Sequence, residues 1–295
     1  LKVLYRGAEI LIFDEPTAVL TPQEVDELFN TFRRLTEQGK GVIFISHKLD
    51  EVLDVADRIT GVRRGKSVET MAKSEADKQK VAELMVGKPV LLSVDNPPPQ
   101  PGEVVLEVEN VTFRNDEGIV TLNGINLEIR EGEIYGIAGV EGNGQNELAR
   151  VLMERMALES GTVRLYGEEL DRYDIRERRD LGIGFIPDDR GRFGLILPFS
   201  LADNLVLGRH HRAPFVNGAE IIQKQEIQSF ARQAIQDYDI RTPSEAIPAH
   251  ALSGGNQQKV IVARELSSEP KLLVASQPTR GVDVGAMEFI YKQLV

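Results

Sequence analysis

Two nine-residue segments of the chain, 262 positions apart, follow one pattern. Residues 9–17 read Glu-Ile-Leu-Ile-Phe-Asp-Glu-Pro-Thr, and residues 271–279 read Lys-Leu-Leu-Val-Ala-Ser-Gln-Pro-Thr. In both segments an apolar run of strand length ends in two polar residues and a Pro-Thr turn. Solenoid repeats have periods of roughly 20–50 residues, so a repeat this long indicates two homologous domains in tandem. On this register Leu1 corresponds to Ala263, and we expect only the later part of the first domain to be present.

The segments between the two copies favour an α/β fold. Short, wholly apolar runs alternate with helical patterns, which is typical of a mostly parallel sheet covered by helices on both faces. The expected strands are residues 10–13, 42–45, 59–62, 104–108, 125–129, 133–138 and 183–186, and the expected helices are 22–38, 48–56, 75–85, 147–156, most of 200–238, and 287–294.

A proline-rich segment interrupts this alternation. Residues 96–102 read Asn-Pro-Pro-Pro-Gln-Pro-Gly, and three consecutive prolines cannot lie inside a helix or a central strand. We interpret the segment as a semi-rigid linker between domains, with a surface loop as the alternative. Residues 1–95 would then be the C-terminal part of the first domain, and residues 103–295 most of the second.

Composition excludes several classes of protein. The formal net charge is −11, which argues against binding nucleic acid through its phosphates. There is no cysteine, which excludes a disulfide framework and thiolate zinc sites and fits a cytoplasmic protein. No apolar run approaches the ~18 residues that span a bilayer, and no segment resembles a signal peptide. A membrane role would therefore depend on a partner protein.

A glycine-rich loop lies between an expected strand and an expected helix. Residues 139–146 read Gly-Val-Glu-Gly-Asn-Gly-Gln-Asn. Such a loop turns its backbone N–H groups inward and the helix N-terminus adds partial positive charge, so the loop can hold phosphates. The glycine spacing matches G-x-x-x-x-G-K-[ST], but Gln145 replaces the lysine and Asn146 the serine or threonine. Taken alone, the loop is equally consistent with a tight strand-to-helix turn.

A second string opens another helix. Residues 252–259 read Leu-Ser-Gly-Gly-Asn-Gln-Gln-Lys. Ser253, Gly254 and Gly255 offer hydroxyl and N–H donors at a helix N-terminus, which makes a second phosphate-facing surface. The alternative is an ordinary helix start, because serine is a favoured N-cap residue.

The ends of two apolar runs in the first repeat carry ionisable residues. Asp14 is of the type that holds Mg²⁺, and Glu15 is of the type that faces an attacking water. His47 ends the neighbouring run, where it would contact a γ-phosphate. The alternatives are a charged strand terminus followed by a turn, and a structural histidine.

Together these strings resemble an ABC ATPase over nearly the whole chain, which implies tandem ABC-type ATPase domains with an antiparallel β subdomain and a helical insert. In the first domain the resemblance makes Glu15 and His47 catalytic, Asp14 a magnesium ligand, and residues 18–21 the D-loop. Phe113 becomes a candidate for stacking on adenine. The nucleotide-binding candidates of the second domain, which would end before its switch histidine, are Gly139, Gly142, Asn143, Gly144, Gln145 and Asn146 of Walker A, Asp188 of the Q-loop, Ser253, Gly254, Gly255 and Gln257 of the signature, and Ser276 and Gln277 at the Walker B position.

Four strings point to one branch of that family. The signature string, with Pro-Asp-Asp-Arg at 187–190, resembles sugar importers that have two fused ATPase domains. The loop at 139–145 and Ala-Ser-Gln-Pro-Thr-Arg-Gly at 275–281 look closest to its nucleoside or basic-membrane-protein-type importers. The resemblance implies ATP and Mg²⁺ as cofactors and the cytoplasmic face of the cell membrane as the location. It also implies transmembrane permease subunits and a substrate-binding protein as partners, with the permease contacting residues 188–238.

The two nucleotide sites that the resemblance implies are unequal. ABC proteins hold ATP between the Walker motifs of one domain and the signature of the other. The first-domain residues Asp14, Glu15 and His47 would therefore act with the intact Ser253 signature in a competent composite site. The opposite site has lost the lysine, the metal carboxylate and the water-positioning glutamate, each of which supplies charge to phosphoryl transfer. We expect one hydrolytic site and one degenerate site, and no hydrolysis by this chain alone, since the first domain's phosphate loop is not in it.

Other tandem ABC proteins remain as alternatives. A regulatory or non-transport nucleotide-binding protein is one of them. Ribosome-associated relatives usually join their domains by a long charged helix, and DNA-repair relatives usually carry zinc-binding cysteines. The short proline-rich linker and the absence of cysteine argue against both of these classes.

Overall fold

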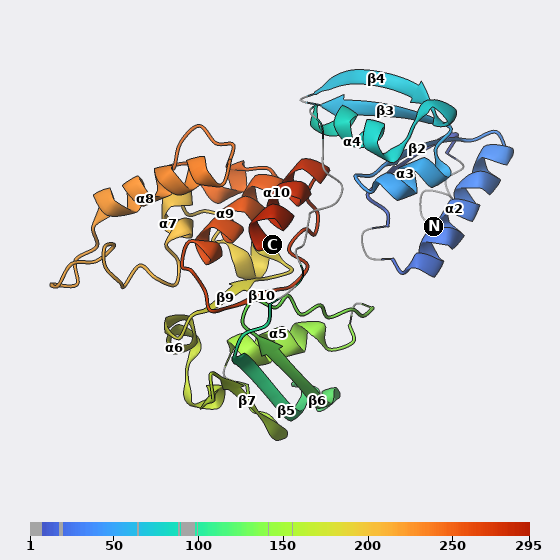
Figure 1. The fold of residues 1–295 in the computed structure, drawn as a ribbon. Coiled ribbons are helices and arrows are strands. Elements are labelled where there is room, and N and C mark those ends of the chain that lie inside the picture. Colours follow the sequence, from blue (N-terminus) through green and yellow to red (C-terminus); the bar gives the residue numbers. More distant parts are fainter. Residues whose placement is uncertain are drawn as a thin grey trace. The chain divides into compact units, whose positions relative to one another are not determined.

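The computed structural model describes residues 8–17, 20–63, 65–87, 89, 98, 100–140, 142–154 and 156–295. The chain divides into two compact units (Figure 1). The first comprises Leu1–Asp95 and Gly281–Val295, and the second comprises Asn96–Arg280. The division falls where the proline-rich segment begins, although residues 96, 97 and 99 of that segment lie outside the described residues. The sequence did not predict that the last segment groups with the first unit.

A parallel strand pair opens the first unit, as the apolar runs predicted. Strand β1 (Ile10–Asp14) pairs with β2 (Gly41–Ile45) over their whole length. Helix α2 (Pro22–Glu37) connects them, as parallel pairing requires a crossover. The helix begins after Thr21, whose hydroxyl and Glu24 form a capping box, with a proline in the first turn.

One face of this strand pair is covered and the other is open. Phe29 and Phe32 of α2 pack against Phe13 and Phe44 of the strands, with ring centroids 4.6–5.8 Å apart. These aromatic contacts place the helix on one face. On the opposite face, the four isoleucines of the two strands are 47–66% exposed. The sequence predicted helices on both faces of the sheet, but among the described residues only one face of this strand pair is covered.

The rest of the first unit is built around a hairpin. Strands β3 (Arg58–Arg63) and β4 (Lys66–Ala72) pair antiparallel. Their inner side chains pack with three helices around a small apolar cluster of Leu49, Ile59, Met71, Val81, Ala82 and Val284. The helices are α3 (Leu49–Val55), α4 (Lys78–Val86) and α10 (Val284–Leu294). The 3₁₀ turn η1 (Lys73–Glu75) follows β4 and has no buried residue. The contacts of Val284 explain why α10 groups with this unit.

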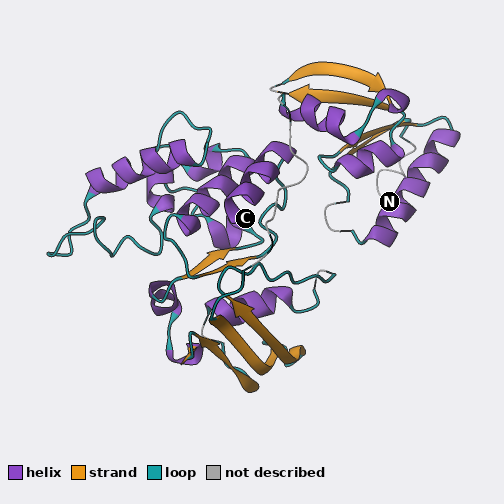
Figure 2. Cartoon of the chain, viewed as in Figure 1, coloured by secondary structure: helices purple, strands orange, loops and turns teal. Residues whose placement is uncertain are grey.

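A four-stranded antiparallel sheet forms one part of the second unit. Its order is β6-β5-β7-β8, and α5 lies across β5 and β6 (Figures 1 and 2). The inward side chains of the strands pack on α5 in one apolar cluster. The elements are β5 (Val104–Arg114), β6 (Val120–Arg130), α5 (Gln145–Met153), β7 (Ser160–Leu165), β8 (Glu168–Glu169), the 3₁₀ turn η2 (Leu170–Arg172) and α6 (Ile175–Asp180).

The other part of the second unit contains a second parallel pair and a group of helices. Strand β9 (Ile183–Ile186) pairs with β10 (Leu272–Ala275), and α7, α8 and α9 pack on one another. Helix α9 is buried along most of its length, with four consecutive side chains, residues 260–263, fully covered. The remaining elements are the π-helical turn η3 (Arg190–Gly194), α7 (Leu201–Leu205), α8 (Lys224–Asp237), the 3₁₀ turn η4 (Ala249–Ala251) and α9 (Gly254–Leu266).

A buried ionic group joins α9 to its neighbours. Glu265 is 1% exposed and accepts from Arg264 at 2.7 Å, from Arg179 at 3.1 Å and from the backbone N–H of Phe185 at 3.1 Å. Burial is the largest single influence and raises the pKa of Glu265, but the two guanidinium groups and the N–H together bring that pKa below its usual value. The carboxylate therefore stays ionised and ties α9 to α6 and β9.

Several sequence expectations were wrong. Residues 133–138 form no strand, because none of the described strands pairs with them, and Ile134, Tyr135 and Ile137 are 45–62% exposed. The expected helical insert is interrupted between α7 and α8 by turns. Strands β4 and β7 were not predicted. Among the described residues, no helix has both the length and the apolar character needed to cross a bilayer.

Candidate functional site

Glu15 and His47 are in direct contact in the first unit. Each follows one strand of the β1–β2 pair, and the backbone N–H of Glu15 donates to the Ile45 carbonyl at 2.9 Å. This pairing brings the two side chains together, with His47 Nδ1 2.6 Å from Glu15 Oε1. Glu15 also has a backbone φ of +48°, which is uncommon outside glycine and marks strain held by its surroundings. The structure thus joins the two predicted catalytic residues.

The neighbouring turn is fixed by a small polar group. The Thr17 hydroxyl donates to Glu51 Oε2 at 2.6 Å, and Lys48 Nζ lies 3.0 Å from both Glu51 Oε1 and the Thr17 carbonyl oxygen. Asp14, the predicted magnesium ligand, is exposed at the carboxyl end of β1. No cluster of three acidic or histidine ligands occurs among the described residues. Residues 18 and 19 of the predicted D-loop lie outside the description.

The glycine-rich loop of the second unit leads into α5. Gly142 and Gly144 have φ values of +89° and +97°, which only glycine adopts readily. At Gly144 a Cβ would also lie 2.6 Å from the Thr121 carbonyl oxygen, whereas at Gly142 it would meet nothing within 4 Å. Gly144 is therefore required both by conformation and by close approach to β6. Residue 141 of the loop lies outside the described residues.

The amide of Gln145 folds back across this loop. Its Nε2 donates to the Val140 carbonyl at 3.0 Å, and its Oε1 accepts from the backbone N–H of Asn143 at 3.1 Å. The side chain of Asn143 donates to the same Val140 carbonyl at 2.9 Å. Two predicted phosphate-binding side chains thus bind the loop itself, as their neutral amides permit.

Three predicted site residues from different elements meet beside the loop. Asn146 is in the first turn of α5, Asp188 follows β9, and Ser276 follows β10. Asn146 Nδ2 donates to Asp188 Oδ2 at 3.3 Å, and the Ser276 hydroxyl donates to Asn146 Oδ1 at 3.4 Å. Gln277, next to Ser276, is exposed and has φ +45°. The carboxyl ends of the parallel pair and the start of α5 therefore converge on one point, as in other open α/β sheets.

Two arginines that the sequence did not single out extend this contact. Arg280 NH1 lies 3.6 Å from Asp188 Oδ2, and its carbonyl oxygen accepts from Arg190 NH1 at 3.0 Å. Arg190 Nε donates to Gln257 Oε1 at 3.3 Å. Asp188 and Arg280 are 18% and 33% exposed, so solvent screens this ion pair only in part. Both arginines lie in strings that carry the family resemblance, so those strings were the sequence signal that could have identified them.

The signature string forms the start of α9. Ser253 is the N-cap residue, yet its hydroxyl makes no capping bond and instead accepts from Asn256 Nδ2 at 3.0 Å. Gly254 is half-buried and Gly255 buried. The amide of Gln257 is turned inward and its Nε2 donates to the Ala249 carbonyl at 3.1 Å. The predicted donors are therefore present at this helix start, but Gln257 is engaged within the unit.

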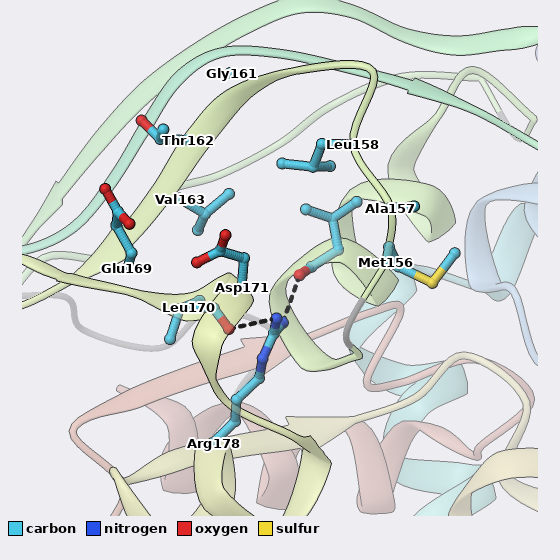
Figure 3. A pocket seen from close by; sticks show the side chains of 11 residues that line it. Met156, Ala157, Leu158, Gly161, Thr162, Val163, Glu169, Leu170, Asp171 and Arg178 are labelled. Carbon is cyan, nitrogen blue, oxygen red and sulfur yellow. Dashed lines mark hydrogen bonds between the residues drawn. The ribbon is translucent and has the colours of Figure 1, made fainter.

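Neither the predicted adenine-stacking residue Phe113 nor a cavity in the second unit belongs to the candidate site. Phe113 is only 5% exposed and packs in the core of β5, so its ring is not available to stack on adenine. A cavity of about 460 Å³ lies near the C-terminal end of α5, away from the predicted site (Figure 3). Arg178 lines it but donates to the carbonyls of Val151 and Leu170, both at 2.7 Å, and is 2% exposed. This arginine holds the end of α5 in place.

Comparison with known proteins identifies the family. The model of the family described as "ABC transporter" matches residues 122–280. The nucleoside import ATP-binding protein NupA of Lactococcus lactis subsp. cremoris (strain MG1363) is 43% identical over 295 residues. The guanosine import ATP-binding protein NupO of Bacillus subtilis (strain 168) is 44% identical over 295 residues. These alignments cover 100% of this chain and 58% of each relative, so the chain spans little more than half their length.

A solved structure shows the same fold. The dimeric ATP-binding cassette MJ0796, in a post-hydrolysis state bound to ADP and Pi, superposes with a TM-score of 0.54 at 25% identity. The match covers 64% of this chain and 81% of the cassette. A single ABC ATPase fold is thus shown by structure and by sequence, and residues 122–280 make up more than half of the chain. The chain belongs to the ABC transporter family.

Proposed function

We propose that the chain is part of the ATP-binding, ATP-hydrolysing subunit that powers import of a nucleoside or a sugar. Family membership and the names of the two relatives support this proposal. The subunit acts at the cytoplasmic face of the membrane, with transmembrane permease subunits and a substrate-binding protein as its partners. A regulatory or non-transport role is not favoured by any observation on this chain.

The subunit contains two fused ATPase domains. Residues 1–95 belong to the first, residues 96–102 are the linker, and residues 103–295 belong to the second. Support comes from the repeat, because its two copies share backbone features as well as sequence. Each copy has a parallel strand, then a residue with positive φ, then a helix with a side-chain N-cap, and these features recur 262 positions apart.

One nucleotide site is competent and the other degenerate. The observation that carries this asymmetry is the 2.6 Å contact between Glu15 and His47. In the second copy of the repeat, Gln277 stands at the position of Glu15. A carboxylate can orient and deprotonate the attacking water, whereas a neutral amide cannot take up the proton. The competent site uses Asp14, Glu15 and His47 with the signature donors Ser253, Gly254 and Gly255.

ATP and Mg²⁺ fit the residues proposed for that site. Mg²⁺ usually keeps one or two carboxylate ligands and takes its remaining ligands from phosphates and water. Exposed Asp14 suits this role without a larger protein cluster. The degenerate site holds nucleotide with the backbone of residues 139–146 and with neutral or singly charged side chains, namely Asn143, Gln145, Asn146, Asp188, Ser276 and Gln277.

Phosphate release by the intact protein tests the asymmetry. Glu15→Gln should lower kcat by about 10²–10⁴-fold, the usual contribution of a general base. Gln277→Ala should leave turnover near that of the unmodified protein. Glu27→Gln, on the exposed surface of α2, is the matched control for loss of one carboxylate. Comparable losses from Glu15→Gln and Gln277→Ala would contradict the proposal.

A further inference from the structure

The carboxylate of Glu51 joins the two segments that carry Glu15 and His47. Glu51 lies in the first turn of α3, and its Oε2 accepts from the Thr17 hydroxyl at 2.6 Å and from the Ser46 hydroxyl at 3.4 Å. Thr17 comes two residues after Glu15, and Ser46 comes directly before His47. One side chain therefore bonds to both of the loops that place the proposed catalytic pair, although it is not a member of that pair.

The carboxylate of Glu51 is itself held in place. Its side chain is 13% exposed, and Lys48 Nζ lies 3.0 Å from its Oε1. The same Nζ donates to the carbonyl of the buried Thr17 at 3.0 Å, and the backbone N–H of Lys48 donates to Ser46 Oγ at 3.1 Å. Hydrogen bonds in which one partner is charged are shorter and stronger than neutral ones. The four side chains therefore form one connected group between the ends of β1 and β2.

The catalytic pair depends on such support, because burial does not hold it. The side chains of Glu15 and His47 are both partly exposed. Glu15 also has a φ of +48°, a sparsely populated conformation that persists only where the surrounding structure determines it. Pro16 joins Glu15 to Thr17, and its ring fixes its own φ, so a shift of Thr17 is passed on to Glu15. The bonds to Glu51 are thus placed to set the positions of both catalytic side chains.

We propose that Glu51 is a positioning residue for ATP hydrolysis. It holds the loops of Glu15 and His47 so that the Glu15 carboxylate faces the attacking water, and it acts through Thr17 and Ser46 rather than by touching the nucleotide. A misplacement of about 1 Å can lower the rate of an enzyme about 100-fold, so a small movement of these loops is sufficient. The inference rests on the proposed function, in which Glu15 is the general base.

Steady-state ATP hydrolysis by the intact protein tests this role. Glu51→Gln should lower kcat by about 10–100-fold and leave KM nearly unchanged, because misplacement of the pair affects the chemical step. Asp50→Asn is the matched control. It removes one carboxylate from the same turn of α3, where Asp50 is exposed and forms a surface ion pair with Lys78. The control should leave both kcat and KM unchanged.

Two variants of Thr17 repeat the test without changing the charge of the protein. Thr17→Val keeps the shape of the side chain but removes the hydroxyl that donates to Glu51, so it should lower kcat as Glu51→Gln does. Thr17→Ser retains the hydroxyl and should keep kcat near that of the unmodified protein. This pair decides the question if Glu51→Gln does not fold. A role in folding alone would lower the stability of the variants and leave the kcat of the folded protein unchanged.

Combination with Glu15→Gln shows whether Glu51 acts through Glu15. Once the Glu15 carboxylate is gone, Glu51→Gln should lower the residual turnover far less than it does in the unmodified protein. A further loss of the same size would overturn the inference, as would a change confined to KM, or a normal kcat in both Glu51→Gln and Thr17→Val. A normal kcat in Glu15→Gln alone would instead overturn the proposed function, and the inference with it.

Discussion

Glu15 and Gln277 adopt the same left-handed backbone conformation, with φ values of +48° and +45°, although they lie 262 positions apart. Glu15 follows Asp14, the last residue of β1, and Gln277 follows Ser276, the first residue after β10. Each precedes a Pro-Thr pair. At the same spacing, Thr21 and Asp283 are the N-caps of α2 and α10. The repeat therefore preserves the local backbone while exchanging a carboxylate for an amide. The two copies share the strained conformation, so the asymmetry that we propose depends on the side chain: Glu15 carries a carboxylate where Gln277 carries a neutral amide.

His47→Ala should reduce turnover without a matching change in KM. The ring is held 2.6 Å from Glu15, where it can contact the group on which negative charge develops. Loss of one such contact lowers kcat by about 10²–10³-fold. Steady-state ATP hydrolysis by the intact protein measures this fall in kcat and any change in KM. His250→Ala is the control, because that ring is exposed and its Nδ1 lies 3.2 Å from the backbone carbonyl oxygen of Leu197 in the second unit. Equal effects of both variants would contradict the role of His47.

Gln145→Lys should tighten nucleotide binding at the loop of the second unit. A charge-assisted hydrogen bond to a phosphate contributes about 1.5–3 kcal/mol, which corresponds to roughly 10–150-fold in Kd. Gln225→Lys adds the same charge on the exposed surface of α8 and should leave the affinity nearly unchanged. Titration calorimetry with ADP distinguishes them. Equal tightening by both variants would mean that net charge, rather than the position of the lysine, sets the affinity.

Gly144→Ala should weaken nucleotide binding and lower stability more than Gly142→Ala. Both residues have positive φ, so both alanines are strained by about 1–2 kcal/mol. At Gly144 the added methyl would also lie 2.6 Å from a backbone oxygen of β6, and neither group can move without displacing the loop. Thermal unfolding and ADP affinity give the comparison. Indistinguishable variants would show that the loop does not rely on that close approach.

Glu265→Gln should destabilise the protein at neutral pH by about 3–5 kcal/mol, the usual consequence of breaking a buried ion pair. The pKa of Glu265 is lowered in the folded protein, so its contribution is fully present above the unfolded value of about 4.3 and is lost as the pH falls through the folded value. The variant should therefore lose less stability on acidification. Urea unfolding at a series of pH values measures both effects.

The control for that experiment is Glu159→Gln. Glu159 forms an ion pair with Arg114 in which both side chains are about half exposed. Such surface pairs contribute about 0–1 kcal/mol, so this variant should unfold almost as the unmodified protein does. If Glu265→Gln proved equally mild at neutral pH, the buried group around α9 would not have the stabilising role assigned to it.

The sequence predicted correctly those elements whose structure follows from the residues of a single segment. The runs at 10–13 and 183–186 form strands because wholly apolar runs suit a parallel pair. Residues 133–138 are also largely apolar but have no pairing strand among the described residues, and a strand alone leaves its backbone groups unpaired. Strand β4 was missed because Met71 is its one buried residue, so no alternating pattern marks it.

The site was predictable to a similar degree. Asn146, Asp188 and Ser276 were each identified from motifs, and the structure brings them together. The contacts of Arg190 and Arg280 could not be read from the sequence, because they depend on side-chain directions fixed by two separate loops. The exclusion of Phe113 likewise came from packing, since an aromatic residue on a strand can face either the core or the solvent.

The folded-back amide of Gln145 has a consequence for how fast and how tightly the second unit can take up a nucleotide. The side-chain amide of Gln145 donates one hydrogen bond to Val140 and accepts one from Asn143. If a phosphate binds in this loop as we propose, both hydrogen bonds must first break. At about 1 kcal/mol net for each bond, displacement weakens apparent affinity by roughly 30-fold. Under the proposed function, the apparent affinity for nucleotide is the intrinsic affinity multiplied by the fraction of molecules in which this amide has left the loop.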